Sequence, residues 1–270
     1  MLFKVAVFQG RMGRRLSLDE KILIFKQQPD VVCLPEYFQI DGAIADYHRA
    51  ALLRSEHLKY LLRLSEELNT ALVGGTVVEA VGDRLYNACY VLDRGEILGQ
   101  YYKRYPVPNE MKKGITPGED TLVVGVNGVR VGVMICGDVF YPAMYDDMRR
   151  DDADVVVIPT TSPFRHDDTV SAKEERDRTY FLSGAQRAGA LVAKVCGVGT
   201  LFGKPLQGRS LIAAPWGICN RIDFKNEDKV RLLTYTVDIN ELRDFRRHLP
   251  LLSEETSTPT DTSADGVETA

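Results

Sequence analysis

Three residues with the chemistry of a covalent catalyst each stand at the end of an apolar, strand-like run. Glu36 directly follows DVVCLP, Lys103 follows the run that ends in QYY, and Cys136 closes VRVGVMI just before Gly137 and Asp138. A cysteine nucleophile needs a base to take its proton and a cation to stabilise negative charge, and these residue types supply both. Because open α/β folds place ligands at the carboxyl ends of strands, the three side chains can meet at one cleft. Either charge taken alone would also suit a solvated strand end.

The remaining cysteines and the histidines are weaker candidates. Four cysteines lie in or beside apolar segments, where a thiol usually only packs: Cys33, Cys89, Cys196 and Cys219. Among the histidines only His166 falls in a loop that suits an active site, and we expect the others on the surface: His48, His57 and His248. Five widely separated cysteines without a C-x-x-C pair predict neither a disulfide framework nor a zinc ribbon, which fits a reducing cytoplasm. Glu36 is therefore the better candidate base.

The elements around these residues predict an α/β fold. Near the N-terminus apolar runs alternate with amphipathic segments, including a long helical segment over 44–68. From 71 to 102 the strands are separated only by Gly-Asp and Arg-Gly turns, and Asn127-Gly128 predicts another hairpin. Beyond a proline-rich loop over 105–118, further helices are expected over 141–151 and 172–187. Strands buried on both faces then suggest a four-layer α-β-β-α sandwich of two mixed sheets flanked by helices.

Composition and charge indicate one globular domain. The 270 residues are 44% hydrophobic and 27% charged, and the net charge of −4 offers no field to gather nucleic acid or anionic lipid. No apolar stretch reaches the length of about 18 residues that a membrane span needs, so we expect no membrane partner. From Ser253 onward the chain is acidic and nearly devoid of large apolar residues. We therefore expect a domain over 1–252 and a disordered acidic tail over 253–270.

The order of the motifs resembles the carbon–nitrogen hydrolase, or nitrilase, superfamily. LPE, YYKR, a loop with P-N-E and T-P-G, and V-x-V-M-I-C-G-D-x-x-x-P follow one another along the chain. IPTTSPF and the pattern G-x-S-x-I-x-x-P-x-G, from Gly208 to Gly217, extend the resemblance over residues 3–240. Several short motifs in the same order are more specific than any one of them.

The resemblance implies a role for each matched residue. It makes Glu36 the general base, Lys103 the oxyanion-stabilising lysine, Cys136 the nucleophile and Glu110 an additional loop glutamate. It also implies that the backbone N–H of Gly137 joins Lys103 in the oxyanion hole. No metal or organic cofactor is implied. The resemblance further implies a homodimer or a higher homo-oligomer, built partly through residues 141–151.

Two departures from the family pattern weaken the assignment to a subfamily. The segment from Gly184 to Ala188 reads Gly-Ala-Gln-Arg-Ala where the family often has Arg-Ala-x-Glu-Asn. Cys196 stands where a strand asparagine is usual. These positions suit structure or interfaces better than chemistry, so they weaken the subfamily assignment more than the catalytic assignments.

The sequence C-G-D resembles the amidase-type branch, whereas true nitrilases typically show C-W-E. We therefore expect hydrolysis of a small amide or ureido substrate through an acyl-thioester, in which Lys103 favours the Cys136 thiolate and Glu36 removes its proton. Candidate pocket walls by position, for which ordinary rim packing is an equal explanation, are Tyr37, Phe140, Tyr141, Thr160, Thr161 and Arg165. Arg165 is also a candidate partner for a substrate carboxylate, although a surface-loop arginine is the simpler interpretation.

Other functions fit parts of this pattern. An N-acyltransferase would share every step through the thioester, a true nitrilase would share the scaffold, and a non-catalytic binding subunit would not need an intact Glu, Lys and Cys set. A metal-dependent phosphoesterase also stacks two sheets and carries an early strand-end glutamate, but it needs a late Asp-His pair. Here the late His248 has no adjacent aspartate. The sequence leaves the substrate and the oligomer size open.

Overall fold

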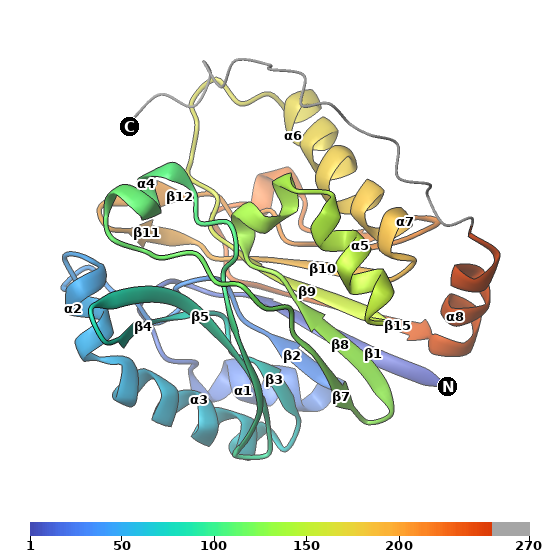
Figure 1. The fold of residues 1–270 in the computed structure, drawn as a ribbon, viewed down its shortest axis with the longest axis horizontal. Coiled ribbons are helices and arrows are strands. Elements are labelled where there is room, and N and C mark those ends of the chain that lie inside the picture. Colours follow the sequence, from blue (N-terminus) through green and yellow to red (C-terminus); the bar gives the residue numbers. More distant parts are fainter. Residues whose placement is uncertain (250–270) are drawn as a thin grey trace.

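Two β-sheets pack face to face in the computed structural model, which describes residues 1–249, and helices cover the outer face of each sheet (Figure 1). This arrangement confirms the expected four-layer α-β-β-α sandwich of two mixed sheets. The tail expected over 253–270, and the end of the domain expected at residue 252, lie outside the described residues.

The first sheet holds seven strands in the order β15-β1-β2-β3-β5-β4, with β6 paired to β5. Strands β1, β2 and β3 run parallel to one another, while the other pairings are antiparallel. The bounds are β1 Leu2–Gln9, β2 Val31–Cys33, β3 Ala71–Val73, β4 Val77–Val81, β5 Arg84–Asp93, β6 Glu96–Tyr102 and β15 Arg231–Asp238.

The second sheet holds six strands in the order β14-β13-β10-β9-β8-β7, with β8, β9 and β10 parallel. The bounds are β7 Val123–Val126, β8 Val129–Val133, β9 Val155–Thr160, β10 Leu191–Cys196, β13 Leu211–Ala214 and β14 Gly217–Arg221. A separate hairpin joins β11 Gly199–Leu201 to β12 Lys204–Leu206.

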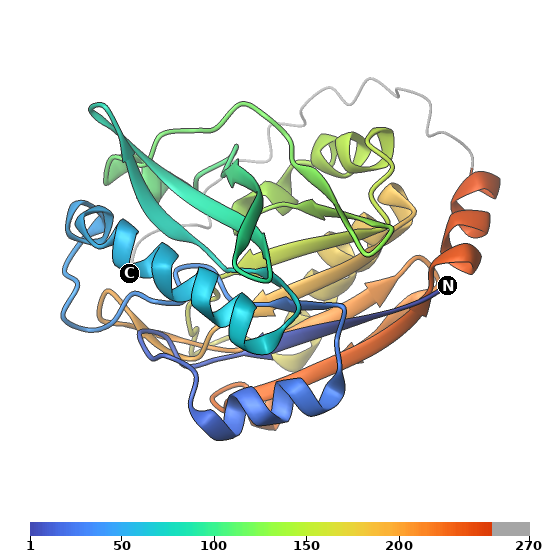
Figure 2. The ribbon, with the colours of Figure 1, turned by 90° about the horizontal axis from the view of Figure 1, so that it is seen from below.

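Helices α1, α2 and α3 cover the first sheet, and α5, α6 and α7 cover the second (Figure 1). In the turned view, α3 crosses the outer face of the first sheet and α1 lies towards its β1–β15 side (Figure 2). The bounds are α1 Leu18–Gln27, α2 Tyr47–Leu52, α3 Arg54–Leu68, α4 Pro108–Lys112, α5 Ala143–Arg150, α6 Val170–Arg176, α7 Ser183–Ala188 and α8 Ile239–His248. Short turns complete the set: η1 Cys136–Phe140, η2 Asp177–Leu182 and η3 Phe224–Asn226. No helix within residues 1–249 is long and apolar enough to cross a membrane.

The alternation of side chains along β1 shows why its apolar run is continuous. Val5 and Val7 belong to the core cluster that lies between the sheets, together with strand residues of the second sheet. Ala6 and Phe8 point the other way and pack with leucines of α3. Each face of a strand must be apolar when both faces are buried, so the period of two that marks a half-exposed strand is absent here.

The predicted turns are confirmed where positive φ angles are needed. Asn127 and Gly128, with φ of 48° and 79°, join β7 to β8. Arg94 and Gly95, with φ of 46° and 87°, join β5 to β6. A two-residue hairpin of type I′ requires positive φ at both central positions, which glycine and asparagine tolerate best.

The structure differs from the sequence expectation in several helices. The proline-rich loop contains α4, which begins at Pro108, a residue that suits the first helical position because it needs no N–H donor there. The helix expected over 44–68 is broken at Leu53 into α2 and α3. The helix expected over 172–187 contains the π-helical turn η2. His57, expected on the surface, is only 8% exposed on α3.

Candidate active site

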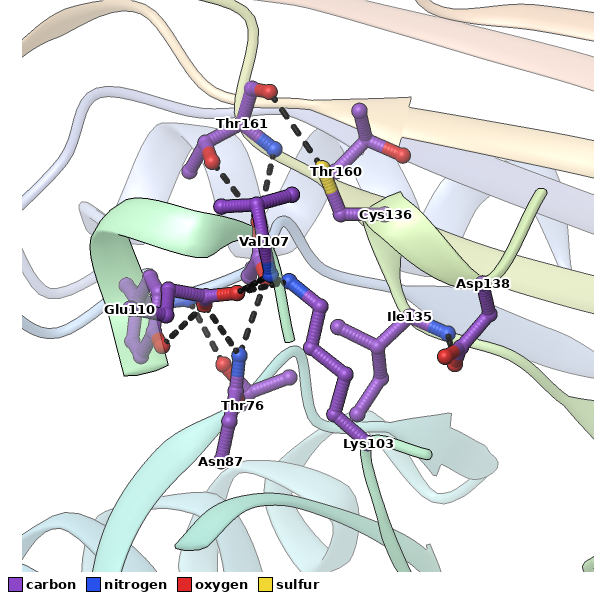
Figure 3. Close-up of polar contacts among 12 residues, drawn as sticks. Thr76, Asn87, Lys103, Val107, Glu110, Ile135, Cys136, Asp138, Thr160 and Thr161 are labelled. Carbon is purple, nitrogen blue, oxygen red and sulfur yellow. Dashed lines mark hydrogen bonds and ion pairs between the residues drawn. The ribbon is translucent and has the colours of Figure 1, made fainter. Parts of the chain in front are cut away.

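Lys103 lies between two carboxylates in the interior of the protein (Figure 3). Its Nζ donates to Glu36 Oε1 at 2.8 Å and to Glu110 Oε2 at 2.7 Å. The three side chains are at most 5% exposed. Residues separated by 67 and 7 positions in the sequence therefore form one buried ionic cluster.

The backbone of the first sheet places Glu36 at the end of β2. The chain turns sharply after this residue, because Tyr37 has a φ of 54° and its N–H donates to Thr76 Oγ1 at 2.9 Å. Gly75 lets a neighbouring strand end come close: its φ is 67°, and a Cβ there would lie 2.0 Å from the Pro35 carbonyl oxygen. The strand ends are thus packed against each other tightly enough to fix the direction of the glutamate.

Lys103 and Glu110 are held by their own backbone neighbours. The N–H of Lys103 donates to the Asn87 carbonyl at 2.9 Å, which continues the β5–β6 ladder past the end of β6. Glu110 lies on α4, where its Oε2 also accepts the N–H of Val107 at 2.8 Å. A carboxylate at a helix N-terminus satisfies a backbone donor that has no partner inside the helix.

Cys136 begins the turn η1 just beyond β8, and its backbone is strained. Its φ of 39° is in the left-handed region, which costs a residue with a side chain energy and is concentrated at functional sites. The sulfur donates to the carbonyl oxygen of Thr161 at 3.6 Å. Cys136 is partly exposed, whereas Cys33, Cys89 and Cys196 are completely buried. Of these four cysteines, only Cys136 is a partly exposed residue on a strained turn.

Gly137 and Asp138 shape this turn. A Cβ at position 137 would lie 2.8 Å from the Tyr105 carbonyl oxygen and 3.0 Å from Val107 Cγ1, so this position favours glycine. The Lys103 stem is also near, because its Cε lies 3.7 Å from the same Cβ position. Asp138 accepts three hydrogen bonds: from the Ile135 N–H at 2.7 Å, the Tyr105 N–H at 2.8 Å and the Tyr101 hydroxyl at 2.8 Å. The aspartate of C-G-D therefore positions the turn that carries the cysteine.

Two residues that the sequence analysis did not assign to the carboxylates bind them directly. The side-chain amide of Asn87 donates to Glu36 Oε1 at 2.9 Å and to Glu110 Oε1 at 3.2 Å. Thr161, expected only as a pocket wall, donates to Glu36 Oε2 from its N–H at 3.0 Å and from its hydroxyl at 2.7 Å. Asn87 had a signal in the sequence, since it is a polar amide inside the apolar run of β5.

The electrostatics of the cluster favour a charged lysine and a neutral thiol. Burial opposes the charge of Lys103, but Glu36 and Glu110 outweigh it and raise the pKa of Lys103 well above its usual value. Burial also opposes the charge of Glu110, but the Lys103 charge and the hydrogen bonds from Lys103, Tyr37 and Val107 lower its pKa.

Lys103 favours the Cys136 thiolate, as expected, but it is not the largest influence on the pKa of this thiol. Burial, and next the charge of Glu36, raise the pKa of the Cys136 thiol, and the opposing effect of Lys103 is smaller. The reason is charge balance: one ammonium already faces two carboxylates, so a thiolate would add a second surplus negative charge.

The candidate pocket residues divide into two groups. Tyr37 is buried beside the cluster and its hydroxyl donates to Glu110 Oε1 at 2.6 Å, so it acts on the carboxylate rather than forming an open wall. Thr161 contacts Glu36, as described above, and Thr160 is buried with its hydroxyl donating to the Ile158 carbonyl at 2.9 Å.

Phe140, Tyr141 and Arg165 lie further out. Phe140 lines a groove of about 450 Å³ between α5 and α7 that contains none of the cluster residues, and Tyr141 stacks on Tyr105 with ring centroids 3.6 Å apart. Arg165 is exposed in the loop after β9. The structure therefore does not bring these three side chains to the ionic cluster.

The family model for carbon–nitrogen hydrolases matches residues 12–247 of this chain. The protein therefore belongs to the carbon–nitrogen hydrolase family and is a hydrolase enzyme, which confirms the resemblance inferred from the motifs.

Curated relatives divide into two kinds. A glutamine-dependent NAD(+) synthetase of Aquifex aeolicus is 33% identical over 259 residues, which is 90% of this chain and 42% of that protein. A glutamine-dependent NAD(+) synthetase of Xanthomonas campestris is 29% identical, over 69% of this chain and 34% of its own length. The omega-amidase NIT2 of Mus musculus is 22% identical, over 85% of this chain and 84% of that protein. The chain thus spans less than half of each synthetase.

Solved structures share the fold at low identity. A carbon–nitrogen hydrolase of Helicobacter pylori G27 has a TM-score of 0.79 at 18% identity, covering 95% of this chain and 96% of that chain. A mutant of the amidase of Nesterenkonia sp. AN1, solved with the acetamide moiety of fluoroacetamide added covalently at its active-site cysteine, has a TM-score of 0.70 at 18% identity, over 90% and 93% of the two chains.

Proposed function

We propose that this protein hydrolyses the carbon–nitrogen bond of a small amide through an acyl-enzyme on Cys136. The observation that carries the proposal is the buried Glu36–Lys103–Glu110 cluster beside a partly exposed cysteine on a strained turn. The covalent acetamide adduct in the Nesterenkonia amidase, which shares this fold, supports it.

The charge balance of the cluster suits a concerted first step. Glu36 takes the proton of the Cys136 thiol as the sulfur forms a bond to the amide carbon, and the electron pair of the carbonyl π bond moves to oxygen. The local charge of two carboxylates and one ammonium is minus one before the step. It is also minus one afterwards, because the protonated Glu36 is neutral and the new oxyanion carries the charge.

In this proposal Lys103 and the backbone N–H of Gly137 stabilise that oxyanion. The ammonium of Lys103 stays charged because both carboxylates raise its pKa, and its stem lies against Gly137. Fixed donors aimed at developing charge contribute most to catalysis in a water-excluded site. Glu36 then returns its proton to the leaving amine, the C–N bond breaks, and a water activated by Glu36 hydrolyses the thioester.

A small primary amide is the substrate class that the relatives support best. The omega-amidase relative matches this chain over most of both lengths, and C-G-D agrees with the amidase-type branch. The test is ammonia release from a panel of short aliphatic amides, ureido acids and nitriles, with the variant Cys136→Ala as control. Release from nitriles alone would overturn the amide assignment, and unchanged release by Cys136→Ala would overturn the acyl-enzyme.

Acyl transfer is distinguished by the second product. We expect free acid from the amide in water, and a hydroxamate only when hydroxylamine is added to intercept the thioester. Acid formation that requires no added amine supports hydrolysis. A protein that forms no acid but transfers the acyl group to amines would instead be an N-acyltransferase.

Glutamine is a second candidate substrate, favoured by the match to the two glutamine-dependent synthetases over 90% and 69% of this chain. The chain would then release ammonia from the side-chain amide of glutamine. Ammonia release from glutamine at a higher kcat/KM than from amides without an α-amino group would favour this substrate. The reverse order would favour the omega-amidase type.

We also propose that the protein self-associates through the surface around α5. Phe140 and Tyr141 are 54% and 45% exposed there, and the groove between α5 and α7 is largely apolar. Sedimentation at micromolar concentration is expected to show a dimer or a larger assembly. A monomer at all concentrations would overturn this proposal without affecting the catalytic one.

A further inference from the structure

All acceptor positions of the proposed base are occupied in the free enzyme. Glu36 Oε1 accepts from Lys103 and Asn87 at 2.8 and 2.9 Å, and Oε2 accepts from the N–H and the hydroxyl of Thr161 at 3.0 and 2.7 Å. An ionised carboxylate has about four acceptor positions. No position is left for the thiol proton that Glu36 must receive.

Thr161 also holds the nucleophile. Its carbonyl oxygen accepts from Cys136 Sγ at 3.6 Å, so the hydrogen bond of the thiol goes to the Thr161 backbone (Figure 3). One residue therefore forms hydrogen bonds with both reacting groups.

Only one of the three Thr161 contacts is easily removed. The N–H and the carbonyl are fixed by the backbone that follows β9, whereas the hydroxyl turns about a single side-chain bond. Thr161 is half-buried, so its side chain has room to turn. Rotation of the hydroxyl frees one acceptor position on Glu36 Oε2 while the remaining three hydrogen bonds keep the carboxylate in place.

We propose that the Thr161 hydroxyl caps Glu36 in the free enzyme and that an entering amide displaces it, so that the Cys136 thiol takes its position on Oε2. Thr161 is thus a positioning residue that acts through Glu36. The proposal rests on the proposed function, because it assigns Glu36 and Cys136 the roles given there. An amide offers the displaced hydroxyl a hydrogen-bonding partner through its carbonyl oxygen or its N–H groups. The cap therefore couples activation of the nucleophile to the presence of substrate.

The test measures thiol reactivity without substrate. Methyl methanethiosulfonate contains no amide; the Cys136 sulfur attacks its sulfenyl sulfur, methanesulfinate leaves, and the thiol proton goes to the available base. Thr161→Ala removes the cap, and Thr161→Ser retains a hydroxyl. Thr70→Ala is the matched control, since the Thr70 hydroxyl donates to the Pro29 carbonyl at 2.7 Å, in a different part of the first sheet. Peptide mapping identifies the modified cysteine.

At pH 7 we expect Thr161→Ala to react at Cys136 about tenfold faster than the wild type, because a hydrogen bond to a charged group contributes energy of the order that a tenfold change requires. Thr161→Ser and Thr70→Ala are expected to react at the wild-type rate. An equal or slower rate in Thr161→Ala would mean that the hydroxyl only orients Glu36, and it would overturn the proposal.

The pH profile gives a second readout that a purely structural role would not move. Loss of one donor makes the Glu36 carboxylate less stable relative to its protonated form, so the acid limb of kcat/KM moves to higher pH in Thr161→Ala. The other titratable groups that face Glu36 are unchanged in this comparison: Lys103, Glu110, Cys136, Tyr37 and Tyr47. An acid limb at the wild-type position would contradict the cap.

Failure of this proposal is distinguishable from failure of the proposed function. If the wild-type protein hydrolyses amides and Thr161→Ala has unaltered thiol reactivity, the proposal of a capping hydroxyl is wrong and the proposed function stands. If Cys136→Ala keeps full amide turnover, the proposed function through an acyl-enzyme on Cys136 is wrong.

Discussion

Within residues 1–249, two buried lysine–carboxylate pairs lie near cysteines, and only one of these two has the features of a catalytic site. Lys194 Nζ donates to Asp177 at 2.8 Å on the second sheet, with Cys196 two residues away on the same strand. Its side chain is 2% exposed, close to the 1% of Lys103. Residue type, burial and hydrogen-bond length therefore do not separate the two pairs.

Charge balance and backbone geometry do separate them. Asp177 also faces Arg209 at 3.9 Å, so that pair has a surplus of positive charge, whereas Lys103 faces two carboxylates. Cys196 lies within the extended strand β10 and is fully buried, while Cys136 occupies a strained turn and is partly exposed. The surplus negative charge around Lys103 therefore provides a base, and the strained turn at Cys136 provides access for a substrate.

The largest effect is expected from removing each cysteine in turn. Cys136→Ala is expected to lower amide turnover by about 10⁴-fold or more, as loss of a covalent nucleophile usually does. Cys196→Ala is expected to keep turnover near the wild-type value and to lower the free energy of unfolding by about 1 kcal/mol. Steady-state ammonia release and urea denaturation measure both. Loss of turnover in Cys196→Ala alone would reverse the assignment.

Removing each lysine is expected to distinguish catalysis from stability. Lys103→Met lowers kcat by about 10²- to 10³-fold through loss of oxyanion stabilisation. Lys194→Met leaves Asp177 buried with only a distant arginine, so the free energy of unfolding falls by about 3 kcal/mol while kcat changes little. Lys103→Met also destabilises the fold, because two buried carboxylates lose their partner. Only a large change in kcat at constant folded fraction supports the catalytic role.

The pH dependence of thiol reactivity tests the charge balance around Cys136. Because burial and Glu36 raise the pKa of this thiol, the thiolate fraction increases with each step from pH 7 to pH 9, and so does the rate with methyl methanethiosulfonate. Cys196 is expected to stay unreactive over this range because it is buried. A rate at Cys136 that is already constant from pH 7 upwards would show a stable thiolate and contradict the neutral resting state.

The smallest effects are expected from removing one tyrosine hydroxyl near each of the two lysine–carboxylate pairs. Tyr101→Phe removes a donor to Asp138 and lowers the free energy of unfolding by about 1 kcal/mol, with a several-fold loss of kcat because the turn at Cys136 loosens. Tyr145→Phe makes the same chemical change near η2, where the hydroxyl donates to the Tyr180 carbonyl at 2.8 Å. It is expected to affect stability only. Equal losses of kcat in both variants would show that Asp138 has no special role.

The sequence was sufficient for the residues whose chemistry is local. Glu36, Lys103 and Cys136 each follow an apolar strand, and α/β folds place ligands at the carboxyl ends of strands, so a shared cleft could be predicted. That the cleft joins the ends of two different sheets could not. The hairpin at Asn127 and Gly128 was also predictable, because its conformation is a property of those two residues.

The partners of the carboxylates could not be predicted in the same way. Thr161 reaches Glu36 across 125 positions of sequence, and this contact depends on how the two sheets are packed. Asn87 stands out as a polar residue in an apolar strand, but its two acceptors are set by the tertiary fold. The pKa of the thiol likewise could not be predicted from the lysine alone, since it depends on burial and on the sum of the nearby charges.

The base and the nucleophile belong to different sheets, since Glu36 follows β2 of the first and Cys136 follows β8 of the second. The distance between Glu36 and Cys136 therefore depends on the relative position of the two packed sheets. Heat, or truncation of a valine in the core between the sheets, would shift one sheet slightly relative to the other. Both sheets would keep their hydrogen bonds, but the Cys136 sulfur and the Glu36 carboxylate would no longer be aligned. Heat inactivation is accordingly expected several degrees below the melting of secondary structure, so that turnover acts as a sensitive gauge of inter-sheet alignment.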